Sequence, residues 1–417
     1  MQDFSKVARK ITFVLFLAQS LASAGFIAVA TISSILGARL GGSPAWAGVP
    51  SACYLLGSAL AASAWGYVME KYGRRVGITI GLFTGAAGAF LAIISTNAGN
   101  LLGFLAGMAL MGMANAAVVL GRFAAAEVNP PEKRGKALAS VVLGGTFGSV
   151  FGPLIIGPAG VLAKSYGMDE LSGAFIITLG LFVLAMIIVA IALRPDPREV
   201  GRELAKLYPE SGGLDTARSA WEILRQPKAF TALMAMILGQ VVMVAVMVIT
   251  SLHMKNHNHM LSDISTVISA HTFGMYAFSV VSGWLADKWG RAQVILVGAL
   301  VLVLSCLTAP ISPDVLPLSV SLFLLGLGWN FCFVGGSTLL ADQLSPAERA
   351  RTQGINDLLV GFASASASLS SGIVFASLGY TLVAVISAML AGIPIFFSIR
   401  MLREQKGKTQ AQAPGGA

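Results

Sequence analysis

Long apolar segments recur along this chain, and no other feature restricts its possible folds as strongly. A helix needs about 20 predominantly apolar residues to cross a bilayer, and twelve segments meet this requirement. They lie near residues 11–37, 44–69, 76–95, 100–126, 136–163, 171–193, 229–254, 263–286, 293–311, 315–342, 354–378 and 380–402. Only 11% of the residues are charged, against about 25% in soluble domains. The sequence therefore predicts an all-α membrane protein with twelve transmembrane helices in a lipid bilayer.

A single long polar connector divides the twelve segments into two sets of six. We predict an N-terminal six-helix bundle over residues 1–193, a linker over 194–228, a C-terminal six-helix bundle over 229–403 and a tail over 404–417. The first segment has a second interpretation as a signal peptide, because Ala22-Ser23-Ala24 resembles a cleavage site. Its apolar run continues to about Ile35, which favours an uncleaved first span.

The basic residues are distributed unequally between the two sides of the predicted membrane. The outer loops keep only Arg39, Lys164 and Lys255, whereas the other connectors and both ends of the chain are rich in Lys and Arg. Because cytoplasmic loops carry the excess of positive charge, both termini and the linker are expected in the cytoplasm. The net charge of +9 lies in these short connectors, so it predicts no nucleic-acid partner.

A glycine- and charge-rich motif follows the second segment and recurs after the eighth. Its residues are Gly66, Glu70, Lys71, Gly73, Arg74 and Arg75 in the first copy, and Gly283, Asp287, Lys288, Gly290 and Arg291 in the second. Equivalent glycines of the two copies are 217 positions apart. Such an agreement indicates that the two halves are repeats of one structural unit.

A second pair of charges repeats with almost the same separation. Glu127 precedes Arg134 by seven residues after the fourth segment, and Asp342 precedes Arg349 by seven after the tenth. The two acidic residues are 215 positions apart. We therefore place both elements in equivalent loops of the two halves.

These loops resemble the signature of the major facilitator superfamily, Gly-x-x-x-Asp-(Arg/Lys)-x-Gly-Arg-(Arg/Lys). The first copy departs from it in having Glu70 in place of Asp, which keeps the carboxylate. The resemblance covers the whole chain and implies two pseudo-symmetric bundles that work by alternating access. It implies transport, with no enzymatic activity and no prosthetic group, and we expect a monomer.

The repeated charges are candidate gating residues. Glu70 and Asp287 can accept hydrogen bonds from helix-end amides or from arginines, and Glu127 and Asp342 can pair with Arg74, Arg75 or Arg291. Such pairs would hold the inner gate closed in one state and break in the other. The alternative is that these charges only fix the topology. The glycines permit a tight turn and close helix approach.

Glycine and proline are concentrated in the fifth segment, as Gly148-x-x-x-Gly152-Pro153 and Gly157-Pro158. The pattern is similar, though imperfectly, to an element of antiporters of the same superfamily. We favour a structural interpretation, a kinked helix that packs closely on a neighbour.

Sulfur and imidazole side chains gather around the seventh and eighth segments. All 4 His lie between positions 253 and 271. Met243 and Met247 lie four apart on one helix face, as do His271 and Met275 on the next helix. At 1.5 Å per residue, Met247 and Met243 lie roughly 10 and 16 Å below the outer end of their helix, and His271 and Met275 roughly 12–21 Å below theirs. If the two faces meet, three thioethers and one imidazole converge.

Thioether and imidazole ligands suit Cu(I) rather than hard cations. The outer turn between these helices carries the same ligand types and is a candidate for metal recruitment, through His253, Met254, His257, His259 and Met260. The alternative is that methionine fills gaps in an apolar core.

The two spaced pairs resemble the motif of the CcoA-like copper importers, bacterial inner-membrane proteins of the same superfamily. That resemblance implies import of copper through Met243, Met247, His271 and Met275, and delivery to cytoplasmic acceptors for assembly of cbb3-type cytochrome oxidase. Further sulfur is available at Met108, Met111, Met113 and Cys332, for which packing is the favoured interpretation.

Two other transport functions compete with copper import. A neighbouring branch of the group resembles riboflavin importers, for which Gln19, Gln240, Trp329 and Asn330 are candidate cavity contacts. A drug-efflux antiporter is the other, weakened by the absence of an acidic residue in mid-span. A non-transporting metal sensor is disfavoured because the tail after Arg403 is short, and no P-loop is present for ATP-driven pumping.

Overall fold

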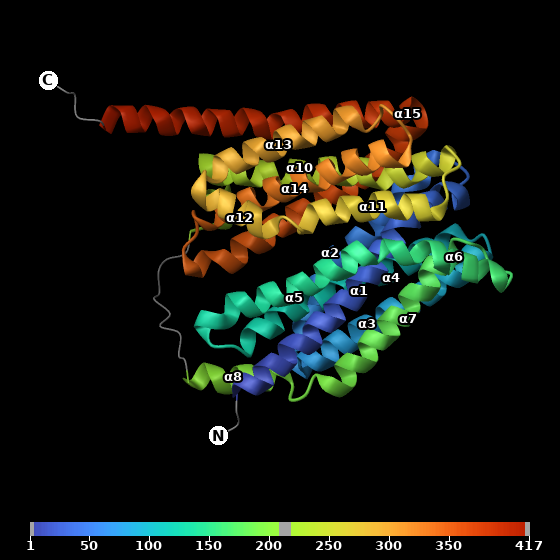
Figure 1. Ribbon diagram of the computed structural model, residues 1–417. Helices are drawn as coiled ribbons and strands as arrows, with labels where there is room; N and C mark the ends of the chain where they lie inside the picture. The colour runs from blue at the N-terminus through green and yellow to red at the C-terminus, as the bar shows by residue number, and fades with distance from the viewer. Residues whose placement is uncertain (1–3, 208–217, 413–417) are drawn as a thin grey trace. The chain divides into compact units, whose positions relative to one another are not determined.

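The computed structural model describes residues 4–207 and 218–412, and the regular structure of these ranges is helical (Figure 1). The helices of the N-terminal part are α1 (Phe4–Leu40), η1 (Pro44–Gly48), α2 (Val49–Tyr72), α3 (Arg74–Asn97), α4 (Leu101–Glu127), α5 (Pro131–Phe151), η2 (Pro153–Ile155), α6 (Ile156–Ser165), α7 (Ser172–Ala192) and α8 (Pro197–Leu207). Those that follow are α9 (Ala220–Leu224), α10 (Pro227–Asn256), α11 (Leu261–Tyr276), α12 (Ser279–Lys288), α13 (Arg291–Thr308), α14 (Val315–Ala341) and α15 (Pro346–Gln412).

Eleven helical stretches of the described chain are long and apolar enough to cross a membrane. The longest, 351–404, contains a break at Gly379, whose backbone is not helical, with φ 77° and ψ 179°. The break divides α15 into two arms. With the arms counted separately, the twelve predicted spans and the all-α membrane fold are confirmed.

The arms of α15 run in opposite directions along α10. Asn356 of the first arm donates to Met236 Sδ near the start of α10. In the second arm, Tyr380 hydrogen-bonds Thr250 near the end of α10, at 2.9 Å. The chain therefore reverses at Gly379, where glycine tolerates a backbone that other residues avoid.

The chain divides into two compact units. Unit 1 comprises residues 1–213 and 251–269, and unit 2 comprises 214–250 and 270–417. Unit 1 thus includes the last residues of α10 and the first of α11, beside Gly157 and Gly160 of α6. The polar connector is also shared, because α8 belongs to unit 1 and α9 to unit 2.

In unit 1, α1 and α5 lie side by side and parallel. Cβ atoms added at Gly144, Gly148 and Gly152 would collide with the main-chain oxygens of Phe16, Ser20 and Ala24. Each of these contacts joins positions 128 apart in the sequence, so the two helices advance in register. The helix then changes direction at Pro153, where η2 separates α5 from α6. These contacts support the structural interpretation of the fifth segment.

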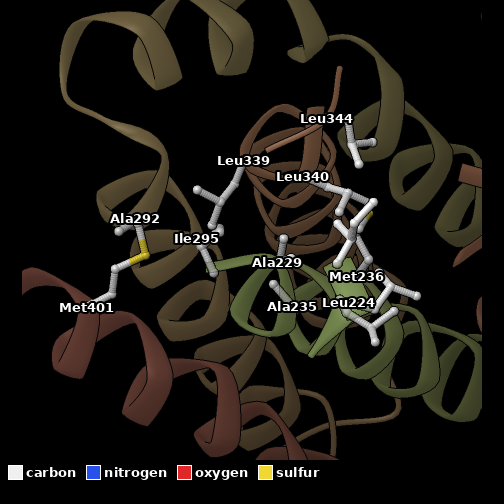
Figure 2. Packing of buried hydrophobic residues seen from close by; sticks show 13 residues of the cluster. Leu224, Ala229, Ala235, Met236, Ala292, Ile295, Leu339, Leu340, Leu344 and Met401 are labelled. Carbon is white, nitrogen blue, oxygen red and sulfur yellow. The ribbon is translucent and has the colours of Figure 1, made fainter. Parts of the chain in front are cut away.

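In unit 2, a cluster of buried apolar side chains holds α9, α10, α13, α14 and α15 together (Figure 2). Ile223 and Leu224 of the short helix α9 are buried in it. The second half of the polar connector is thereby anchored to the C-terminal helices, which the sequence does not indicate.

Candidate functional site

The first signature loop connects α2 to α3 through Gly73, at φ 104° and ψ 157°. A carboxylate caps the helix that follows, and it comes from Asp196, just before α8. Asp196 accepts hydrogen bonds from the backbone N–H groups of Arg74 and Arg75, each at 3.0 Å. It also accepts one from Arg198 N–H at 2.9 Å, so a single carboxylate caps the N-termini of both α3 and α8. Negative charge at a helix N-terminus is favourable because of the helix dipole.

Sequence reasoning assigned no role to Asp196. Its local signal is an acidic residue directly before Pro197, a pattern typical of a helix start. Nothing in the sequence indicates that the same side chain reaches a helix more than 120 positions earlier.

Beside this cap, Arg74 forms a bidentate pair with Glu127 at the end of α4. Its Nε donates to Oε2 at 3.0 Å and its Nη2 donates to Oε1. The structure thus brings together two of the predicted gating residues. Glu70, by contrast, is exposed and has neither a hydrogen bond nor an ion pair within the described part of the chain.

The second signature loop has nearly the same backbone, with Gly290 at φ 108° and ψ 152°. Here Arg291 is shared between two carboxylates: its Nε donates to Asp342 at 2.9 Å and its Nη2 lies 3.0 Å from Asp287. Its Nη1 also donates to Ala286 O at 2.9 Å. The predicted partners Asp287, Arg291 and Asp342 therefore meet in one network.

The remaining predicted gating residues are two glycines and three arginines. Gly66 and Gly283 have open space where a Cβ would lie, with no heavy atom of the described chain within 4 Å, so close helix approach is not their role in this structure. Arg75 and Arg134 are half-buried. The side chain of Arg349 lies outside the described residues.

A charge pair with a buried carboxylate and a partly exposed arginine anchors the second end of the connector to unit 2. Arg218 donates to Glu348 from its backbone N–H, from Nε at 2.8 Å and from Nη2 at 2.9 Å. Ser345 N–H donates to the same carboxylate at 3.0 Å. These bonds, those of Arg218 foremost, hold the pKa of Glu348 well below its usual range.

The four predicted copper ligands lie in unit 2, on α10 and α11. His271 is fully buried, Met243 and Met275 are almost so, and Met247 is half-buried. His271 Nδ1 lies 2.9 Å from Leu322 O of α14. A Cβ on Gly326 of α14 would collide with the backbone of His271, so α11 and α14 are in close contact there.

The hydrogen bond to Leu322 sets the state of the His271 ring. A carbonyl oxygen only accepts, so Nδ1 carries the proton and Nε2 of the neutral ring is left with a lone pair. Nε2 is buried and has no hydrogen-bond partner in the described structure. In histidines that bind metals, one ring nitrogen typically donates a hydrogen bond to a carbonyl or carboxylate, and this bond orients the lone pair of the other nitrogen. Convergence of Met243 and Met247 on this atom stays a prediction.

The outer His/Met turn lies in unit 1. The rings of His253 and His257 are 4.4 Å apart, and His259 Nδ1 lies 3.8 Å from Asp263 Oδ2. Met254 is fully buried, whereas Met260 is 72% exposed. Within the described residues, no three His, Cys, Asp or Glu side chains are grouped so that they could hold a metal ion. Metal recruitment by this turn stays a prediction.

A second cluster in unit 2 combines aromatic rings with amides. Gln240 Oε1 of α10 accepts a hydrogen bond from Trp329 Nε1 of α14 at 2.6 Å. The Trp329 ring is stacked on Phe333, with centroids 5.0 Å apart and planes 17° apart, and Tyr276 of α11 meets its edge at 6.2 Å. The structure thus brings together Gln240 and Trp329, two candidate contacts of the riboflavin alternative, whose contact with a substrate stays a prediction. Tyr276 and Phe333 were not predicted.

The other two candidates of that alternative, Asn330 and Gln19, are bonded to other groups of the protein. Asn330 donates to Met275 O at 2.6 Å and to Ser279 at 2.9 Å, and it accepts from Ser282. Gln19, in unit 1, donates to Ser23 at 3.1 Å. Asn330 therefore fixes α11 and α12 against α14.

The weaker sulfur candidates lie in packed positions. Met108 and Met111 are buried in α4, and Met113 is half-buried. Cys332 is fully buried, with Sγ 3.8 Å from Ile295 O. These positions agree with packing roles.

Comparison with known proteins places this architecture in context. The family model "Major Facilitator Superfamily" matches residues 15–260 and 233–417. The chain is 31% identical to "Uncharacterized MFS-type transporter YdeG" of Bacillus subtilis, over 92% of this chain and 90% of that protein. It is 28% identical to "Riboflavin transporter RfnT" of Brucella anthropi, over 89% and 91% of the two chains.

Solved structures share the fold at low sequence identity. The nucleoside transporter NupG superimposes with a TM-score of 0.70 at 18% identity, over 95% of this chain and 99% of that one. A bacterial homologue of the human lysosomal transporter Spinster gives 0.72 at 14% identity, over 95% and 97%.

Proposed function

Because this chain belongs to the major facilitator superfamily and is a multi-pass membrane transporter, we propose that it carries a small metabolite with a planar heterocyclic ring, of the riboflavin class, by alternating access. The observation that carries this proposal is the cluster of Gln240, Trp329, Phe333 and Tyr276. The similarity to a riboflavin transporter supports it.

The cluster offers the two things that a planar ring needs. Trp329 and Phe333 are stacked on each other, and a planar ligand would extend this stack on an outer face of the pair. Gln240 is oriented by its bond to Trp329: an indole N–H only donates, so the amide oxygen faces Trp329. The Gln240 NH₂ group has no hydrogen-bond partner in the described structure and is available to a ring carbonyl. Small-molecule sites typically place a small number of polar groups among apolar walls.

Uptake of radiolabelled riboflavin into riboflavin-requiring cells without their own importer tests the proposal. Wild type should restore uptake, and Trp329→Leu should reduce it at least tenfold at equal expression, since stacking and the Gln240 orientation are lost together. Trp284→Leu is the matched control, because Trp284 is 56% exposed on α12 and should leave uptake unchanged. Absence of wild-type uptake beside a working reference importer would exclude riboflavin.

Copper is the second candidate cargo, and the buried lone pair of His271 Nε2 favours it. In this case copper would exchange its hydration for Met243, Met247, His271 and Met275, and leave to cytoplasmic acceptors. Radioactive copper uptake by wild type, with loss in His271→Ala and reduction in Met243→Leu, is the expected result. Absence of wild-type copper uptake beside a working positive control would remove copper from consideration, and equal uptake by wild type and His271→Ala would remove His271 from the path.

The ion pairs at the two repeated loops are the basis of a proposal about gating. We propose that Arg74–Glu127 and Arg291–Asp342 stabilise one state of the inner gate and are rearranged in the other, as alternating access requires.

We propose that the protein lies in a bacterial inner membrane with both termini and the basic loops in the cytoplasm. Fusion of a reporter that is fluorescent only in the cytoplasm to the C-terminus should give signal. Fusion of a periplasm-dependent phosphatase at the same point should be inactive. The reverse pattern would invert the orientation.

A further inference from the structure

A groove of about 780 Å³ lies in unit 1, between the first turns of α1 and α5 and the end of α8. Three cationic side chains line it, Arg9 from α1 and Lys133 and Lys136 from α5. No carboxylate of the described residues lines it, and none of the three cations has an ion-pair partner there. The groove is therefore a concentrated positive site at the end of the bundle where the basic loops gather.

The parallel register of α1 and α5 separates charge from apolar surface along this groove. With the offset of 128, Lys133 and Lys136 stand level with positions 5 and 8 of α1, beside Arg9. Phe13, Phe16 and Leu143, which also line the groove, lie four to ten residues further along their helices than the cations. At 1.5 Å per residue, these apolar side chains start roughly 6–15 Å from the cations along the helix axes. The groove is thus cationic at its mouth and apolar within.

The apolar part is open rather than packed. Phe13 is 59% exposed and Leu143 is 51% exposed, and Leu207 of α8 is exposed at the same groove. Open apolar side chains next to unpaired cations match a ligand that has an anionic head attached to a hydrocarbon chain. Basic pockets between transmembrane helices on the cytoplasmic side bind the headgroups of anionic lipids.

We propose that this groove binds one anionic phospholipid, with its phosphate at Arg9, Lys133 and Lys136 and the beginning of an acyl chain against Phe13, Phe16 and Leu143. The volume suits a headgroup and part of a chain rather than a whole lipid. The cavity beside α10 in unit 2 is a weaker site, because it is smaller, about 330 Å³, and its Arg400 is paired with Glu404 at 3.0 Å.

The proposal is tested with the full-length protein in zwitterionic detergent. Phosphatidylglycerol should raise the melting temperature of wild type by several degrees more than phosphatidylcholine does. The double variant Lys133→Gln/Lys136→Gln should lose more than half of this difference. The matched control is Lys71→Gln/Lys288→Gln, which removes two exposed lysines from the signature loops and should keep it.

Two further measurements distinguish a phospholipid from a free anion as the ligand of the groove. Inorganic phosphate at equal concentration should produce no comparable stabilisation; if it does, the groove is a site for free anions and the lipid proposal fails. Wild type should prefer long-chain to short-chain phosphatidylglycerol, and Phe13→Ser should weaken this preference. Equal loss in the groove and control variants would overturn the proposal in favour of non-specific attraction to basic loops.

Discussion

Gly73 and Gly290 have almost the same backbone conformation, yet the charges around the two signature loops are arranged differently. In unit 1, Arg74 is paired with Glu127 alone, and Asp196 from the connector caps the helix that follows. In unit 2, Arg291 binds both Asp342 and the Asp287 carboxylate of the motif itself. The repeat therefore conserves the turn and its arginine but not the partner of the motif carboxylate.

The two motif carboxylates, Glu70 and Asp287, differ in the same way. Asp287, near the end of α12, reaches Arg291 at the start of α13 across the Gly290 turn. Glu70 makes no hydrogen bond or ion pair within the described residues, and Asp196 supplies the negative charge at the start of α3. A longer side chain at position 70 therefore disturbs nothing in this state.

The largest difference between the loops is expected from alanine at the two turn glycines. Both positions have backbone angles that are nearly restricted to glycine, which costs about 1–3 kcal/mol for another residue. At Gly73 the new Cβ would also lie 2.5 Å from Asp196 Oδ2 and displace the cap, whereas at Gly290 it would meet only the flexible end of Gln293. Thermal unfolding in detergent should show Gly73→Ala as the more destabilised. Equal destabilisation would mean that the Asp196 cap contributes little.

Removal of the cap itself should have the next largest effect. Asp196→Ala leaves the N-termini of α3 and α8 without their acceptor, and loss of one N-cap costs about 1 kcal/mol. We expect about 2 kcal/mol for the two helices together, measured by unfolding. Asp196→Asn, which keeps an acceptor oxygen, should recover most of it. If Asp287→Ala in unit 2 proved as costly, the two carboxylates would be equivalent and the proposed contrast would be wrong.

The free energy of unfolding at acidic pH should depend on the Arg218–Glu348 pair, which anchors the other end of the connector. The folded-state pKa of Glu348 lies below its ordinary value of 4.5, so the pair stabilises the protein above that pH. This stabilisation is lost as the pH falls from about 4.5 toward the folded-state pKa. Unfolding measured between pH 6 and 3 should be less pH-dependent for Glu348→Gln than for wild type. If the free energy of unfolding of Glu348→Gln depended on pH as strongly as that of wild type, other carboxylates would determine the loss of stability in acid.

The smallest effects are expected at the motif carboxylates. Glu70→Gln should leave stability unchanged within about 0.5 kcal/mol, the range of exposed positions. Asp287→Asn should cost somewhat more, up to about 1 kcal/mol, because it removes an ion pair that is exposed to solvent. A transport defect in Glu70→Gln without loss of stability would show that Glu70 acts in a different state of the cycle.

The sequence predicted the fold more completely than the site. Twelve spans and the repeated loops follow from apolar length and motif spacing, and the break at Gly379 falls between the two predicted spans 354–378 and 380–402. Among the site residues, Arg74–Glu127 and Arg291–Asp342 were expected partners because the repeat presents them twice. Tyr276 and Phe333 were missed because aromatic residues are common in membrane helices and carry no spacing signal of their own.

What the sequence determined by itself is what local composition can encode: helical spans, glycine turns, the repeat and the unequal distribution of charge. The tertiary structure alone decided which distant groups meet: Asp196 with the start of α3, Gln240 with Trp329, and three cations around one groove. The physical reason is that a helix is fixed by bonds within a few residues, whereas a cap or a cavity depends on the register between helices. In unit 1 that register is set by Gly144, Gly148 and Gly152, and its consequences become visible only when α1 and α5 are packed.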